Sequence, residues 1–587
     1  MLLQRLNEYA DRLGDILPAE YYRPKQIHWV LDLKEDGTGK LTDLRVSAKN
    51  RDQARIVPAP YVQRSGPKVP PYLLVDTAEF VLGVPKADKK NPPTKEAQEE
   101  ATRRHAAYRE LALLWAQGTK DSAGAAALKS YFANGGPAGV KIPEDVQAKD
   151  TVAVMVGTRW LHDEPTVKTT WASIARERKS GSDDRTGLCL VCGTTGSLLA
   201  TIPEPVKKGA VPTSGGSNEG QLVSINKAAQ RRDGKIQLVN TPICHRCGGR
   251  TMAVLNHLLA SDTNSRRFRD DGVMVWWTRQ AGDDSAMALL FGNAPDPADV
   301  AHLIDSINNR PTPHAGERVD DDEFHALTLG LNNARLVVRD WIDIPLTGLK
   351  ATVAAWYQDH GVYDGWTGTT RYVPLWLLAL CCGRAQDGRY AKDSAPHGLE
   401  ADLVHSALHR TPPPARTLPL LLQRIHADQQ IDTARIALLR LILNRSSNPK
   451  DHVMPTLDDT CREPSYLCGR LFFVLEDIQN TALPNLNTTL RDKYFRTAAT
   501  APGTTLTNLH VDATAHLKRL RRDNKKAAAS LERRLGELFA MVSDDIPRHL
   551  TPVQQGRFVI GYEHERAAKW DRIRRAKEKG QATGEEQ

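Results

Sequence analysis

Two short cysteine pairs constrain this chain more than any other feature of its sequence. Cys189 and Cys192 stand in Gly-Leu-Cys-Leu-Val-Cys-Gly, and Cys244 and Cys247 in Pro-Ile-Cys-His-Arg-Cys-Gly-Gly. The sulfurs of such a pair can converge on one ion, and a glycine after the second Cys lets the backbone curl so that amides point at the thiolates. Two pairs supply the four thiolates of a closed tetrahedral site, and thiolates favour zinc over magnesium or calcium. We predict a structural zinc held by all four cysteines.

Other interpretations of the cysteines stay open. The pairs can be unrelated to each other, or they can be redox disulfides, although a redox pair usually stands alone between a strand and a helix. His245, inside the second pair, can also replace one Cys as a ligand. The segment from Gly193 to Ile243 is about three times longer than the spacer of most zinc ribbons. Closing a loop of this length costs about 1 kcal/mol more in entropy than closing a usual spacer, whereas a structural zinc contributes roughly 10–16 kcal/mol. The long segment is therefore compatible with a zinc site, and we expect it to carry the function.

The composition is that of a folded protein without a membrane segment. At 587 residues the chain allows about three or four domains. No uncharged apolar run approaches the roughly 18 residues of a transmembrane helix, and the amphipathic N-terminus lacks the apolar core and cleavage site of a signal peptide. The remaining cysteines, Cys381, Cys382, Cys461 and Cys468, are expected to be buried thiols. We therefore expect a cytoplasmic protein in a reducing compartment, with no membrane association.

The net charge of +9 is concentrated near the C-terminus. From His516 onward, seventeen Lys and Arg stand against eleven Asp and Glu, so six of the nine net positive charges lie there. A basic end indicates a polyanionic partner, although a solvated helix surface explains the charge equally simply.

Periodicity predicts strands in the first part of the chain and helices in the second. The expected helices are 1–17, 95–117, 251–260, 344–385 and 514–542, the expected strands are 27–33, 41–46, 152–156, 221–225 and 272–278, and 323–338 is expected to run from strand into helix. In 514–542 the apolar residues share one face, and Lys518, Arg522, Lys525, Lys526 and Arg533 lie mostly off it.

Catalytic motifs are absent from the sequence. It contains no GxxxxGKS or GxxxxGKT loop, no HExxH and no GxSxG. The 18 histidines are scattered, and the dipeptide His162-Asp163 is only a weak signal for a metal nuclease. We predict that the protein is not an enzyme and has no catalytic residues.

A glycine-rich turn between the cysteine pairs is the clearest binding signal. Gly215, Gly216, Ser217 and Asn218 can lay backbone amides and a hydroxyl against a phosphate or a DNA groove, and Asn can read base edges. A plain surface hairpin explains the same residues. Basic residues on both sides of the turn favour nucleic acid. These residues are Lys207, Lys208, Lys227, Arg231 and Arg232.

A series of short runs extends along the chain in a fixed order. They are LLQRLNEYADRL, PPYLLVDTAEFVLG, Gly215-Gly216-Ser217 with Gly220 and Leu222-Val223-Ser224-Ile225-Asn226, Asn240-Thr241-Pro242, Val254-Leu255-Asn256-His257-Leu258-Leu259, VWW, LGLNNARLVVRDW, SYLCGRLFFVLEDIQ and GRFVIGYEHER. Together they resemble the large subunit of the type I-C CRISPR interference complex, Cascade. Two features depart from that family. It usually has aromatic residues where this chain has Ala228 to Gly234, and many members lack the four cysteines.

The resemblance implies a non-catalytic scaffold that reads DNA. Such a subunit binds double-stranded target DNA, recognises the protospacer-adjacent motif (PAM), aids duplex opening and R-loop stabilisation with the crRNA, and recruits a separate helicase-nuclease. Its partners are the crRNA, the target DNA, the Cascade backbone subunits, the crRNA-capping subunit and small subunits. The family also tends to make its helical C-terminal part separately from an internal start, for which Met454 is the candidate here.

We therefore expect an α+β fold: a mixed α/β N-terminal body with a four-cysteine zinc-binding insertion, followed by a C-terminal helical bundle. The expected parts are an N-terminal α/β region at 1–186, the zinc-binding insertion with the glycine-rich loop at 187–250, an increasingly helical remainder at 251–454, and the bundle at 455–587. We expect the turn, Asn226 and the nearby cations to approach the PAM duplex, and the Lys518–Arg534 face to follow nucleic-acid phosphates. The alternatives are a stand-alone zinc-ribbon nucleic-acid-binding regulator, a purely structural subunit, or a metal nuclease around His162.

Overall fold

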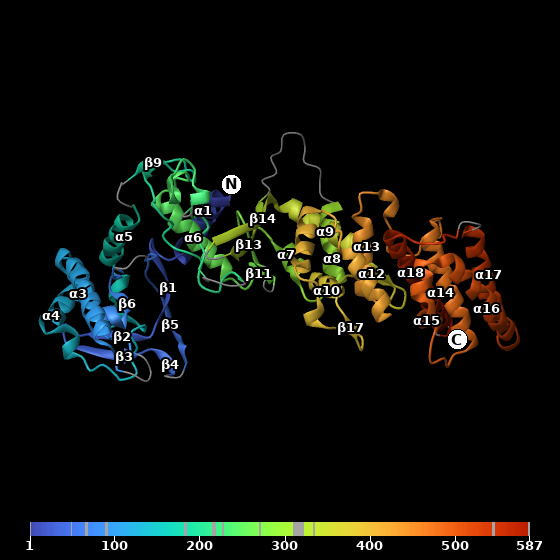
Figure 1. Cartoon of the computed structure of the whole chain (residues 1–587), viewed down its shortest axis with the longest axis horizontal. Coiled ribbons are helices and arrows are strands. Elements are labelled where there is room, and N and C mark those ends of the chain that lie inside the picture. The colour runs from blue at the N-terminus through green and yellow to red at the C-terminus, as the bar shows by residue number, and fades with distance from the viewer. Residues whose placement is uncertain are drawn as a thin grey trace. The chain divides into compact units, whose positions relative to one another are not determined.

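The structure is a computed structural model of the chain, and it describes residues 2–47, 50–64, 69–87, 92–180, 185–213, 219–225, 228–268, 272–308, 322–332, 335–542 and 546–584. Internal contacts divide the chain into two compact units. The first unit holds Met1–Arg279 and His325–Trp341, and the second holds Gln280–Phe324 and Ile342–Gln587 (Figure 1). The four-part division expected from the sequence remains a prediction.

A five-stranded sheet organises the N-terminal part of the first unit. Its order is β3-β2-β7-β6 with β8 paired to β7, and β2 and β7 are parallel. Apolar residues on both faces of β2 and β7 place these strands at the centre of the sheet, where the side chains of Trp115 and Trp171 join the core. The elements are β2 (Trp29–Leu33), β3 (Gly39–Asp43), β6 (Val75–Thr77), β7 (Thr151–Val156), β8 (Arg159–Trp160), α2 (Ala78–Val81), α3 (Lys95–Gly118), α4 (Ala123–Ala133) and α5 (Pro165–Ser180).

Two further sheets and a short hairpin complete the first unit. One sheet has the order β1-β5-β4, and the other has the order β11-β12-β13-β14. Helix α1 packs on α6, and Leu6, Leu255 and Trp277 share one core. The elements are α1 (Leu2–Leu13), β1 (Tyr22–Ile27), β4 (Arg45–Ser47), β5 (Asn50–Pro60), β9 (Thr186–Leu188), β10 (Thr195–Ser197), α6 (His245–Leu259), β11 (Ser265–Phe268), β12 (Gly272–Thr278), β13 (Glu323–Asn332) and β14 (Arg335–Pro345).

The second unit is mainly helical. Helices α9 and α13 pack together, and a small hairpin, β15 with β16, lies beside α18. The elements before the C-terminal bundle are α7 (Ser285–Phe291), α8 (Pro297–Asn308), α9 (Leu346–His360), β15 (Val362–Asp364), β16 (Thr369–Arg371), α10 (Leu375–Leu380), β17 (Ala385–Gln386), β18 (Arg389–Tyr390), α11 (Leu399–His409), α12 (Thr417–Asp428) and α13 (Thr433–Asn444).

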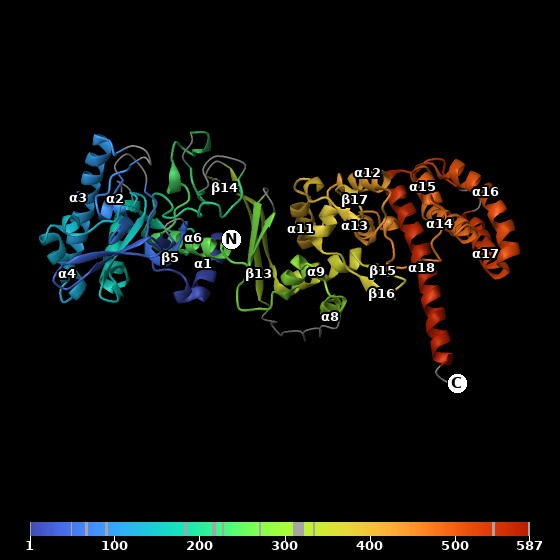
Figure 2. The same cartoon turned by 90° about the horizontal axis from the view of Figure 1, so that it is seen from below.

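Helix α14 forms the centre of the C-terminal bundle. Its neighbours are α15, α16, α17 and α18, and α18 also packs on α12 and α13. Figure 2 shows the C-terminal part of α18 extending beyond the other helices of this unit. Glycines allow α14 and α18 to lie in close contact: a Cβ on Gly469 would stand 1.9 Å from the carbonyl oxygen of Phe558. The helices are α14 (Pro464–Ala482), α15 (Leu490–Thr500), α16 (Pro502–Asp523), α17 (Lys525–Val542) and α18 (Pro552–Gly584).

The predicted fold class is confirmed, since strands and helices mix in the first part of the chain and helices fill the last part. Several element predictions are wrong. The stretch 344–385, predicted to be helical, contains two helices, α9 and α10, with the β15–β16 hairpin between them. Residues 221–225 form no strand and make only one bridge, Gln221 to Arg335. The described residues of 323–338 belong to two paired strands, with no helix among them. The helix predicted at 514–542 is interrupted at Asn524, whose side chain accepts the Ala527 amide at 3.1 Å and caps α17.

None of the described helices combines the length and the apolar character that crossing a membrane requires.

Candidate metal centre and nucleic-acid surface

The first cysteine pair lies at the tip of the β9–β10 hairpin. The hairpin closes through the Cys189 amide, which donates to the Thr194 carbonyl at 2.9 Å, and through the Gly193 amide, which donates to the Cys189 carbonyl at 2.9 Å. Gly193 has a φ of +72°, a conformation that other residues rarely adopt. The curl predicted for the glycine after the second Cys is therefore present in this pair.

The second cysteine pair lies at the start of α6. The Cys244 side chain caps the helix by accepting the Cys247 amide at 3.5 Å. Gly248 follows in helical conformation and serves packing, because a Cβ there would stand 2.3 Å from a methyl group of Leu199. The two glycines that looked alike in the sequence thus have different roles.

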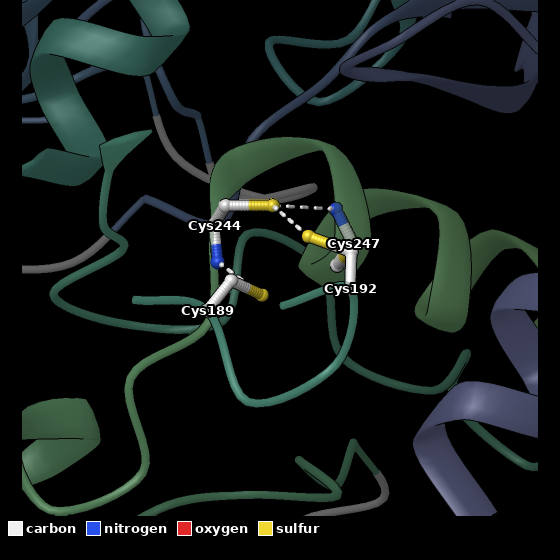
Figure 3. Close-up of side chains that lie close together, drawn as sticks. All are labelled: Cys189, Cys192, Cys244 and Cys247. Carbon is white, nitrogen blue, oxygen red and sulfur yellow. Dashed lines mark hydrogen bonds between the residues drawn. The ribbon is translucent and has the colours of Figure 1, made fainter. Parts of the chain in front are cut away.

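The four sulfurs form one cluster (Figure 3). The Sγ atoms of Cys189, Cys192, Cys244 and Cys247 all lie within 4.8 Å of one another, and those of Cys192 and Cys244 are 3.9 Å apart. Sulfurs at about 2.3 Å from a tetrahedral zinc stand about 3.8 Å from each other. The cluster therefore fits one metal ion, and it favours a shared site over two unrelated pairs.

The surroundings of the sulfurs suit thiolates. The backbone amides of Val191 and Cys244 donate to the Cys189 sulfur at 3.4 and 3.3 Å. Hydrogen bonding by the Cys247 thiol lowers the pKa of Cys244 to about 5, and the Thr194 side chain lowers the pKa of Cys192. Burial raises the pKa of Cys189. A metal ion bound by all four sulfurs would favour their deprotonated, thiolate forms.

His245 is not part of the sulfur cluster. Its Nδ1 lies 2.6 Å from the Tyr21 hydroxyl and its Nε2 lies 3.2 Å from the Ser180 hydroxyl. The ring is buried and anchors α6 to α5 and to the chain before β1. The alternative in which His245 replaces a cysteine has no support in this geometry.

Two backbone hydrogen bonds close the long segment between the cysteine pairs. The Leu199 amide donates to the Ile243 carbonyl at 2.9 Å, and further along, the Val206 amide donates to the Gly220 carbonyl at 2.8 Å. We call residues 207–219 the inner loop. The Asn256 side chain accepts the Lys207 amide at 3.0 Å and donates to Glu204 at 3.1 Å, so α6 fixes the start of this loop.

Several predicted nucleic-acid residues fall outside the described part of the chain. They are Gly215, Gly216, Ser217, Asn218, Asn226 and Lys227. Of the others, Lys208, Arg231 and Arg232 are exposed, whereas Lys207 is half-buried beside Glu204 and burial lowers its pKa. The Asn240 side chain donates to the Arg232 carbonyl at 3.0 Å. The structure does not bring these cations into one described cluster.

A group of cations beside the inner loop was missed by the sequence reasoning. We call Arg23, Lys25, Arg64 and Arg178, with Tyr61 and Tyr72, the cation–tyrosine cluster. The Arg23 guanidinium lies 3.4 Å from the Tyr61 ring centre, and the Lys25 amine and the Arg64 guanidinium lie 3.7 and 3.6 Å from that of Tyr72. Arg23 and Lys25 are two residues apart on β1 and so share a face, which was the available signal.

The cluster carries more positive than negative charge. Arg64 binds the buried carboxylate of Asp76 through two hydrogen bonds of 2.8 and 2.9 Å. Burial lowers the pKa of Lys25 well below its ordinary value, Asp76 opposes this shift, and Arg64 and Arg23 add to it. Bringing a further anion to the cluster would relieve this repulsion between cations.

The exit of the inner loop contacts the chain next to this cluster. The Gln221 side chain donates to the side-chain oxygen of Gln63. The backbone amide of Gln63 donates to the Pro203 carbonyl at 2.9 Å. Both ends of the inner loop are thus joined to the segment that carries Tyr61 and Arg64. The described ends of the inner loop therefore lie next to the segment from Tyr61 to Arg64.

The predicted basic face near the C-terminus is a corner between α16 and α17. Lys518, Lys525 and Lys526 are exposed, and no ion pair links them to a described carboxylate. Arg522 pairs with Asp523 at 2.9 Å. Arg534 does not belong to the exposed face, because it turns inward to Glu565 at 2.8 Å.

His162 has the surroundings of a buried structural residue. Its side chain is completely buried, and burial lowers its pKa to about 4. Among the described residues it belongs to no group of metal-ligating atoms. The geometry therefore gives no support to a metal nuclease at this position.

Comparison with known proteins identifies the family. A family model described as CRISPR-associated protein (Cas_Csd1) matches residues 3–570. A search of curated proteins found no match. Because the family model spans nearly the whole sequence, the resemblance read from the short runs is confirmed, and the chain belongs to the Cas_Csd1 family of CRISPR-associated proteins.

Proposed function

We propose that this CRISPR-associated protein is the non-catalytic large subunit of a type I-C Cascade complex. In this role it binds target duplex DNA, recognises the PAM, aids duplex opening and R-loop stabilisation with the crRNA, and recruits the helicase-nuclease. Its other partners are the backbone, crRNA-capping and small subunits. Sequence is then read mainly by crRNA pairing, while the protein reads the short motif and the backbone.

The observation that supports the proposal is that the described ends of the inner loop are joined to the segment that carries Tyr61 and Arg64. The loop is held at its base by Val206 and Gly220, and Gln221 joins its exit to Gln63. Arg23 supplies charge for phosphates, which position a duplex without reading its sequence. The glycine-rich turn supplies small groups that can approach base edges.

Zinc in this proposal is structural. Cys189, Cys192, Cys244 and Cys247 hold it, and it fixes the β9–β10 hairpin to α6. Since α6 carries Asn256, the metal also fixes the start of the inner loop. A zinc with four thiolates has no open position, so it takes no part in chemistry on DNA.

The test is gel-shift binding of short duplexes by the crRNA-loaded complex, on PAM and scrambled-PAM DNA. Gly216→Pro with Asn218→Ala should abolish the difference between the two duplexes while the complex still assembles. Arg23→Gln should weaken binding to both duplexes and lower the salt slope by about 1, with discrimination kept. Lys129→Gln, an exposed lysine on α4, is the matched charge control.

The outcomes separate the alternatives. If the turn variant keeps full discrimination, the turn is scaffold, and the reader must be sought first in Lys86–Lys95. A stand-alone zinc-ribbon regulator binds DNA without crRNA or sister subunits. A purely structural subunit shows no change with either variant. The proposal of a separate product starting near Met454 fails if the purified complex contains no such fragment.

A further inference from the structure

Two exposed tryptophans lie together on the second unit. Trp366 and Trp570 are 58% and 39% exposed, whereas the other tryptophans of the chain are buried or half-buried. Their ring centres are 5.4 Å apart, at an interplanar angle of 77°. An indole in water loses the stabilisation that burial would give it, so a pair of exposed indoles from distant parts of the chain indicates a binding surface.

The pair is held rigidly. Trp366 lies in the turn between β15 and β16, and this turn lies directly against α18, which carries Trp570. A Cβ on Gly365 would stand 1.9 Å from the Ala567 carbonyl oxygen, and the Tyr363 hydroxyl donates to Asp571 at 2.8 Å. These contacts hold the turn against α18 and so keep Trp366 next to Trp570.

Cations surround the two rings. The Lys577 amine lies 5.3 Å from the ring centre of Trp366, and the Lys569 amine lies 5.7 Å from that of Trp570. Residues 566–578 of α18 contain six Lys and Arg against two acids, and Lys577 is exposed with no ion pair to a described carboxylate. The acids of the adjoining hollow, Asp364 and Glu563, are each paired with an arginine. The net charge beside the rings is therefore positive.

We propose that Trp366 and Trp570 form a stacking platform for an unpaired base of single-stranded DNA, with Lys577 contacting its phosphate. Aromatic faces bordered by cations are how proteins hold single strands without reading their sequence. The hollow beside the rings has a volume of about 280 Å³, which suits one planar ring system. This inference rests on the proposed function, because an R-loop supplies the single strand. It adds a second nucleic-acid surface, distinct from the lysines at the corner of α16 and α17.

The first experiment uses the full-length chain and an oligo(dT) strand. Stacking should quench the fluorescence of the exposed indoles on titration. Trp366→Ala and Trp570→Ala should each weaken binding by about 5- to 150-fold, the effect of one stacked base, while Trp366→Tyr and Trp570→Phe should keep most of the affinity. Lys577→Gln should lower the salt slope by about 0.7, the single-strand value for one phosphate contact, and Lys450→Gln, also exposed, should leave it unchanged.

The second experiment separates this inference from the proposed function. The crRNA-loaded complex with both tryptophans replaced by alanine is tested on PAM and scrambled-PAM duplexes. If PAM discrimination persists and single-strand binding is lost, the platform stands. If single-strand affinity and quenching match those of the wild type, the platform is overturned. It is also overturned if the double variant loses a sister subunit with single-strand binding intact, since the rings then hold a protein. The proposed function is tested separately by Gly216→Pro with Asn218→Ala. That variant should lose the difference between PAM and scrambled-PAM duplexes, whether or not the tryptophans bind a single strand.

Discussion

Arg470 of α14 and Glu565 of α18 face each other in the C-terminal bundle, with Nε of the arginine 2.9 Å from Oε2 of the glutamate and neither side chain exposed. Arg534 donates to both oxygens of the same carboxylate at 2.8 Å. One buried glutamate therefore balances two arginines, and Asp459 accepts from both guanidinium groups at the edge of the network.

Replacing Glu565 by Gln should destabilise the second unit by about 3–5 kcal/mol, because two guanidinium groups lose the charge that compensates their burial. Chemical denaturation of the full-length chain measures the loss. Glu537→Gln is the control, since Glu537 is 45% exposed and pairs with the same Arg534 at 3.2 Å. The control should change stability by less than about 1 kcal/mol, and equal effects of the two changes would contradict the prediction.

Gly469→Ala should also destabilise the bundle. The new methyl group would meet the backbone carbonyl of Phe558, which cannot rotate away, so α14 and α18 must separate at a cost of about 1–3 kcal/mol or more. Gly536→Ala on α17 is the matched control, because its Cβ meets nothing within 4 Å. The control should stabilise by roughly 0.5–1 kcal/mol in the same denaturation assay, through helix propensity alone.

Metal analysis of the purified chain should find one zinc per chain. Cys192→Ser and Cys244→Ser should each lower the zinc content and the melting temperature, and a strong chelator should lower the melting temperature of the wild type. Cys382→Ala, a buried cysteine outside the cluster, should keep the zinc. Full zinc content after loss of Cys192 and Cys244 together would show that the cluster is not the metal site.

The stability of the second unit should fall as the pH drops below about 6.5. Burial lowers the pKa of His360 to about 3, and its ring donates to the Trp356 carbonyl while accepting the Val373 amide, which requires the neutral form. The unfolded chain takes up a proton below pH 6.5 and the folded chain does not. Each such histidine therefore removes about 1.4 kcal/mol per pH unit between pH 6.5 and the folded-state pKa.

His564 behaves in the same way, since burial lowers its pKa to about 3 as well. Melting temperatures between pH 7 and pH 4 should show a flatter dependence in His360→Gln than in the wild type. His549→Gln removes an exposed histidine and should leave the curve unchanged. An unaltered slope in the His360 variant would contradict this account.

Lys525→Ala should reduce the salt slope of target-DNA binding by the crRNA-loaded complex by about 1, with little effect on sequence preference. The side chain is exposed at the start of α17 and no described carboxylate pairs with it. Lys129→Ala on α4 is the control. Unchanged affinity and slope would make the corner of α16 and α17 a solvated surface.

The sequence contained enough to predict the local parts of the structure. The cysteine spacing predicted a four-sulfur cluster because each pair needs only a tight turn, and the apolar runs of β7 and β12 marked buried strands. The break at Asn524 was missed because the apolar period continues across it, although Asn is one of the residue types that cap the start of a helix. Gln221 to Ile225 looks like a strand, yet Leu222 and Val223 pack on the core without a ladder.

The cation–tyrosine cluster and the tryptophan platform could not be predicted in the same way. Tyr72 and Lys25 are far apart in the chain, and so are Trp366 and Trp570. Their meeting depends on how strands and helices pack, which periodicity does not specify. Only Arg23 and Lys25, spaced for one face of a strand, carried a local trace of the cluster.

The two closures of the segment between the cysteine pairs bear on how this protein can evolve. Leu199 with Ile243, and Val206 with Gly220, fix the chain on both sides of residues 207–219. Each doubling of the length of such a loop raises the entropic cost of closing it by only about 0.6 kcal/mol. Mutation can therefore change the length and sequence of the inner loop while the frame around it persists, without any need to rebuild the fold.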